Sequence, residues 1–104
     1  MRTLFLYGIE DARKASAYLD HHLTPNGEGE WTLCDGDRPF AWLRVDPKPE
    51  LYGAASDAVI ERGPCIVADR SGALSYREPD LVAFLKLAQS ALGGTLRDDN
   101  DELL

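Results

Sequence analysis

The chain is poor in cysteine and in positive charge, and it has no long hydrophobic run. Only two of its 104 residues are cysteines, Cys34 and Cys65. Small secreted domains usually carry several cysteine pairs, so the sequence predicts reduced thiols and a cytoplasmic location. The apolar run at residues 4–7 is too short for a signal peptide or a membrane span. A single disulfide between the two cysteines stays open at this point.

Basic residues are outnumbered, with 11 Lys and Arg against 18 Asp and Glu and a net charge of −7. A protein that binds nucleic acid or an anionic membrane usually presents a basic surface, so both kinds of partner are disfavoured. The negative excess instead favours a basic protein partner. A neutral small molecule is also compatible with it.

Motifs for catalysis or cofactor binding are absent as well. The chain has no Gly-rich phosphate loop and no paired-carboxylate or Ser/His/Asp pattern. His21 and His22 are neighbours, so on a helix they would point about 100° apart and could not easily share a metal ion. We therefore expect no metal site and no cofactor, and we expect the two histidines to interact with the C-terminus of a helix.

The composition is that of an ordinary globular domain, with 44% hydrophobic and 28% charged residues. The length allows one domain, which we place at residues 1–93, followed by an acidic, frayed tail at 94–104. Apolar spacing and turn signals predict an ordered series of elements. These are strands over 3–7, 40–45, 65–68 and 73–76, helices over 9–23, 50–62 and 78–92, and an optional hairpin strand over 30–34.

Several short patterns occur at the joints between these elements, namely Val45-Asp46, Pro49-Glu50-Leu51, Gly63-Pro64 and Ser71-Gly72. In this order the chain resembles the thioredoxin and glutaredoxin family over roughly residues 2–92. The resemblance implies an α/β fold in which a central mixed sheet of about four strands, with an extra short strand at 30–34, is flanked by three helices.

The family's C-x-x-C pair would lie where the first strand meets the first helix. Here that junction reads Ile9-Glu10-Asp11-Ala12 and contains no sulfur. A carboxylate at Glu10 or Asp11 would also repel a nearby thiolate. We therefore expect no dithiol exchange at this place. The two carboxylates either form a negative rim beside a groove or simply cap the helix.

Gly63 and Pro64 are the other elements that the resemblance implies. The family's equivalent proline is cis, and its loop would leave the Gly63 backbone free to pair with an extended peptide. Without the resemblance, Pro64 is expected to be trans. Cys65 then lies beside this groove, either as a redox-active thiol or as a buried, inert residue. Trp31 is either part of the core or, if exposed, an anchor for a partner.

These observations favour a non-catalytic, thioredoxin-like module that binds another protein. A small acidic inhibitor or immunity-type protein that neutralises a basic partner would fit this description. Two alternatives stay open, a degenerate thiol-disulfide oxidoreductase that uses Cys65 and an accessory subunit of a larger enzyme. The candidate binding residues are Gly63, Pro64, Cys65, Glu10, Asp11 and Trp31.

Overall fold

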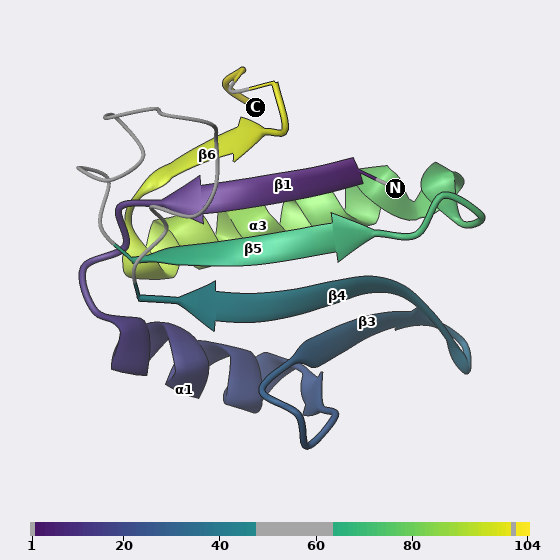
Figure 1. Cartoon of the computed structure of the whole chain (residues 1–104), viewed down its shortest axis with the longest axis horizontal. Helices are drawn as coiled ribbons and strands as arrows, with labels where there is room; N and C mark the ends of the chain where they lie inside the picture. The colour runs from purple at the N-terminus through teal and green to yellow at the C-terminus, as the bar shows by residue number, and fades with distance from the viewer. Residues whose placement is uncertain (1, 48–63, 101) are drawn as a thin grey trace.

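The computed structural model describes residues 2–47, 64–100 and 102–104 (Figure 1). Within these ranges six strands form one sheet in the order β2-β3-β4-β5-β1-β6. Every neighbouring pair is antiparallel. The strands are β1 (Arg2–Tyr7), β2 (Thr24–Pro25), β3 (Trp31–Asp35), β4 (Arg38–Asp46), β5 (Cys65–Arg70) and β6 (Thr95–Asp98).

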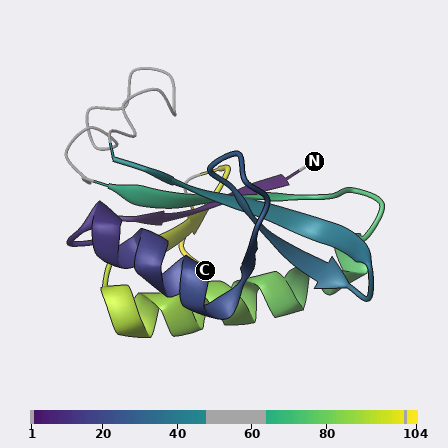
Figure 2. The ribbon, with the colours of Figure 1, turned by 90° about the horizontal axis from the view of Figure 1, so that it is seen from below.

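Two α-helices, α1 (Ala12–His22) and α3 (Glu78–Leu92), accompany the sheet. Figure 2 shows that both lie against the same face of the sheet. The main core fills the space between these helices and the sheet, and its largest members include Leu4, Leu19 and Leu85. A second, smaller cluster of Tyr7, Cys65 and Val67 lies on the opposite face, because side chains alternate along a strand.

This architecture shows that the expected thioredoxin-like fold is wrong. The described residues form a six-stranded antiparallel sheet with two α-helices, where we expected a mixed sheet of about four strands with three helices. The four strands β4-β5-β1-β6 and the two helices follow the split βαβ arrangement. The short strands β2 and β3 extend that core at the β4 edge. The predicted helix over 50–62 lies outside the described residues.

The optional strand at 30–34 is confirmed as β3, which forms a hairpin with β4 through a tight turn at Gly36. The loop that precedes it, residues 26–30, is closed by Asn26. The Asn26 Oδ1 atom accepts hydrogen bonds from the backbone N–H groups of Glu28 at 2.9 Å and Glu30 at 3.3 Å. The Asn26 N–H donates to the Glu30 carbonyl at 2.9 Å, so the loop is internally braced.

Residues 73–76, expected as a strand, instead form a turn that leads into a 3-10 helix, η2 (Ser75–Arg77). Leu74 is buried in the core, and Tyr76 and Arg77 bind the side chain of Asp35 at the β3–β4 turn. Contacts with the distant β3–β4 turn therefore favour the 3-10 conformation of this segment. The alternation of apolar and polar residues over 73–76 could not indicate these contacts.

The C-terminal tail, expected to fray from residue 94, contributes β6 to the sheet. Asp98 is buried, and its carboxylate accepts hydrogen bonds from the N–H groups of Asn100 and Glu102, both at 2.9 Å. The Arg2 guanidinium pairs with the same carboxylate at 3.2 Å. One buried side chain thus binds Asn100 and Glu102 and also links β6 to Arg2 of the first strand.

Candidate binding groove between α1 and β4

The structure brings several of the predicted site residues to one end of the sheet. The Pro64 carbonyl accepts hydrogen bonds from the N–H groups of Gly8 and Ile9, each at 3.1 Å. Cys65 pairs with Tyr7 in the sheet register. The start of β5 is therefore fastened to the β1–α1 junction. Gly63, and with it the Gly63–Pro64 peptide bond, lies outside the described residues.

Asp11 and Glu10 stand at this junction, at the start of α1. Asp11 is the N-cap residue, and its Oδ1 atom accepts a hydrogen bond from the Arg13 N–H at 2.8 Å. This contact satisfies one of the free N–H groups of the first helical turn. The Glu10 side chain is exposed. Asp11 therefore has a structural role in capping, whatever else the junction does.

Cys65 is fully buried, and burial raises the pKa of its thiol to about 12, with a smaller contribution from the Asp46 carboxylate. Arg44 acts in the opposite direction and lowers that pKa. At neutral pH the thiol is therefore protonated, and a protonated thiol is a poor nucleophile. Cys34 is exposed, and both cysteines are free thiols. The arrangement does not activate the Cys65 sulfur.

Trp31 belongs to the core and is only 8% exposed. Its indole Nε1–H donates a hydrogen bond to the Asp20 Oδ1 atom at 2.9 Å. The expected alternative, an exposed tryptophan that anchors a partner, therefore does not apply to Trp31. Through this hydrogen bond, Trp31 holds the carboxylate of Asp20, an exposed residue of α1.

His21 and His22 lie in the last turn of α1, as expected. Their rings meet edge to face at 4.8 Å, and the His22 ring also contacts Tyr18 at 4.3 Å. Among the described residues, no group of three or more potential metal-ligating side chains comes together. In the same part of the chain, no helix is long and apolar enough to cross a membrane.

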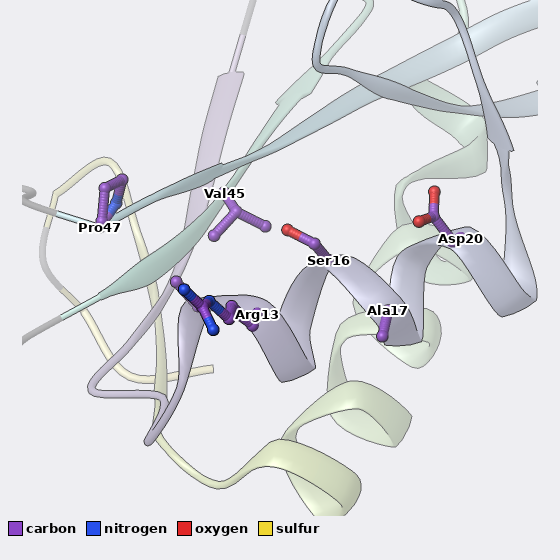
Figure 3. A pocket seen from close by; sticks show the side chains of 7 residues that line it. Arg13, Ser16, Ala17, Asp20, Val45 and Pro47 are labelled. Carbon is purple, nitrogen blue, oxygen red and sulfur yellow. The ribbon is translucent and has the colours of Figure 1, made fainter.

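A groove of about 480 Å³ lies between α1 and the end of β4, and none of the predicted site residues lines it. Its walls are mostly apolar, and Figure 3 shows its side chains. The lining residues are Ala12, Arg13, Ser16, Ala17 and Asp20 from the helix, with Val45 and Pro47 from β4 and its end. Sequence reasoning missed this site.

The only sequence signal for the groove is a spacing of three and four residues between Arg13, Ser16, Ala17 and Asp20, which places them on one side of a helix. This side adjoins the buried side formed by Ala15. The opposite wall comes from β4, and no local pattern in the sequence indicates that β4 faces this part of α1.

Charge is distributed unevenly along the groove. Arg13 is exposed and forms no ion pair with any residue that the structure describes, and the same holds for Asp20. The two are seven residues apart, about 10 Å along the helix axis, too far to pair with each other. Between them the Ser16 side chain points toward Val45 (Figure 3). The groove thus has a cation at one end and a carboxylate at the other.

Comparison with known proteins gives no match to a family model, a curated protein or a solved structure. The resemblance to the thioredoxin family therefore gains no support from relatives. The groove and the charge of the chain are the features that bear on function.

Proposed function

We propose that the chain is a protein-binding module with no catalytic chemistry of its own, and that it docks a basic partner protein. The observation that carries this proposal is the groove between α1 and β4, where the Asp20 carboxylate has no cationic partner among the described residues. Binding of this kind would block the docked surface of the partner, as an inhibitor or immunity-type protein does.

The chemistry of the groove suits binding better than catalysis. Its size is within the range of ligand sites, and apolar walls with a few charged groups are typical of recognition surfaces. A nucleophilic serine needs a base hydrogen-bonded to its hydroxyl. Ser16 forms no such bond within the described part of the chain. The groove therefore offers contacts but no activated group.

The overall charge supports a basic partner. Several carboxylates on and beside α1 form no ion pair with the described cations, namely Glu10, Asp11, Asp20, Glu28 and Glu30. Together with the net charge of −7 they create a negative field. Such a field speeds the encounter with a positive partner, and salt screens it.

The oxidoreductase alternative that uses Cys65 receives no support from the geometry. Burial and a pKa of about 12 keep the thiol protonated and out of contact with a substrate. Redox-active cysteines have the opposite properties, a lowered pKa and partial exposure.

A peptide-display selection tests the proposal. A random peptide library would be selected at low salt against the folded protein, and the same library would be selected in parallel against Asp20→Asn. We expect the wild-type selection to enrich peptides rich in Lys and Arg, and we expect their affinity to fall as salt is added. Asn at position 20 keeps an oxygen that can accept the Trp31 N–H, so this variant removes the charge with little effect on folding.

The matched control is Glu28→Gln, which removes one negative charge from the exposed loop outside the groove. It should bind the selected peptides within about twofold of wild type, since a remote surface charge contributes little. Recovery of no peptide, or of neutral and acidic peptides only, would overturn the proposal.

A further inference from the structure

We propose that the groove between α1 and β4 binds an extended peptide segment of the partner in which an acidic and a basic residue lie three positions apart, the acidic one against Arg13 and the basic one against Asp20. This inference rests on the proposed function and adds the chemistry of the bound segment. It differs from a general attraction between an acidic and a basic protein, because it requires a negative group on the partner.

The groove holds two opposite charges that form no ion pair with a described residue, although the Asp20 carboxylate accepts the Trp31 N–H. Arg13 and Asp20 line the same groove, and within the described residues neither forms an ion pair. In the described part of the chain, the Arg13 backbone N–H donates to the Asp11 cap and its guanidinium forms no ion pair. Its guanidinium is a planar donor that suits a carboxylate. A purely basic ligand would leave this cation facing like charge.

The distance between the two charges indicates the conformation of the bound segment. Seven helical residues separate the two charges by about 10 Å along α1. A polyproline II segment rises about 3.1 Å per residue and repeats every three residues, so residues three apart lie on the same side about 9 Å apart. In a β-strand, side chains three apart point to opposite faces. The spacing therefore favours a polyproline II conformation of the bound segment.

The surface between the two charges also suits a peptide backbone. Ala17 is small, and Val45 supplies an apolar patch opposite the Ser16 hydroxyl. Small residues let the backbone of a ligand come close to the helix. The Ser16 hydroxyl makes no hydrogen bond that the structure describes, so it is free to bind a peptide carbonyl or N–H group.

The test uses short capped peptides of Pro and Ala that contain one Glu and one Lys, with these two residues placed two, three or four positions apart and in both orders. Binding to the full chain would be measured by titration of amide signals in two-dimensional NMR spectra, which also show where the peptide binds. We expect the tightest binding at a spacing of three. The shifted signals should include the amides of Arg13, Ser16 and Asp20.

A double-mutant cycle assigns the contacts. Arg13→Gln and replacement of the peptide Glu by Gln should each weaken binding about fivefold, as for a partly exposed ion pair, and together they should cost little more than either alone. Asp20→Asn and replacement of the peptide Lys by Gln should behave in the same way. The matched control is Lys14→Gln, an exposed cation next to Arg13 that does not line the groove and should leave binding unchanged.

The outcomes separate this inference from the function on which it rests. If basic peptides bind but the peptide Glu makes no difference, or if the shifted amides lie away from the groove, the inference is overturned and the binding function stands. If neither these peptides nor a basic peptide from the display selection binds, both fail together.

Discussion

Burial decides the chemistry of the two cysteines. Cys34 is exposed on β3, and Cys65 is fully enclosed at the start of β5. The sequence places Cys65 directly after Gly63-Pro64, and this position indicates a residue of a functional site. In the structure it packs with Tyr7 and Val67, and the low polarity of this environment disfavours a thiolate.

We expect iodoacetamide near pH 8 to alkylate Cys34 in the native protein and to leave Cys65 unmodified until the chain unfolds. Mass spectrometry of the digested protein would locate each adduct. Rapid alkylation of native Cys65 would contradict the assignment.

The pKa of the Cys65 thiol is raised in the folded state, so the folded protein keeps this proton at a pH at which the unfolded chain loses it. The stability that depends on the protonated thiol is therefore complete below the ordinary thiol pKa and is lost as the pH rises toward 12. Stability measured by urea unfolding should therefore decline in this alkaline range, and less so in Cys65→Ala.

The connection from α3 to β6 leaves no room for a side chain at one of its two glycines. Gly93 and Gly94 both adopt positive φ, at 79° and 96°. A Cβ atom built on Gly94 would lie 2.4 Å from the Tyr7 carbonyl oxygen, whereas one on Gly93 would meet nothing within 4 Å. The residue directly before β6 therefore lies against the end of β1, and only glycine fits at this second position.

Gly94→Ala should lower the free energy of unfolding by about 2–4 kcal/mol, because a clash with backbone adds to the strain of positive φ. Gly93→Ala is the matched control and should cost only about 1 kcal/mol, since it carries the φ penalty alone. Chemical denaturation of both variants would measure the difference. Equal losses would show that the chain shifts at Gly94 to relieve the contact.

At the scale of the whole molecule, the sheet is unevenly supported. β1 and β5 each have a neighbour on both sides, whereas β2 contributes two residues at an edge. Amide hydrogen exchange should follow this pattern. We expect amides in the middle of β1 and β5 to exchange only through global unfolding, and that of Thr24 to exchange at least about a hundredfold faster. Similar protection throughout would mean that the β2–β3 extension unfolds only together with the split βαβ core.

Local elements could be predicted from the sequence, because their signals are local. Apolar spacing indicates α1, α3 and the central strands, and the alternation at 30–34 indicates β3. The pairing of strands could not be predicted, because the strand patterns are equally compatible with a mixed sheet. β6 was missed because charged residues at 97–99 resemble a frayed tail, although Asp98 is buried against Arg2. The groove was missed because one of its walls comes from a distant strand.

The braced loop at Asn26 has a consequence for the chemical ageing of the protein. Asn26 precedes Gly27, and a glycine without a side chain leaves its nitrogen free to attack the asparagine carboxamide, which releases ammonia. In the folded loop, hydrogen bonds to Glu28 and Glu30 hold that carboxamide in place. Unfolding frees it. Each unfolding event therefore allows deamidation. The reaction adds one negative charge and replaces the donor that binds the Glu30 side chain. Because this covalent change persists after refolding, the fraction of deamidated chains would increase with the number of unfolding events.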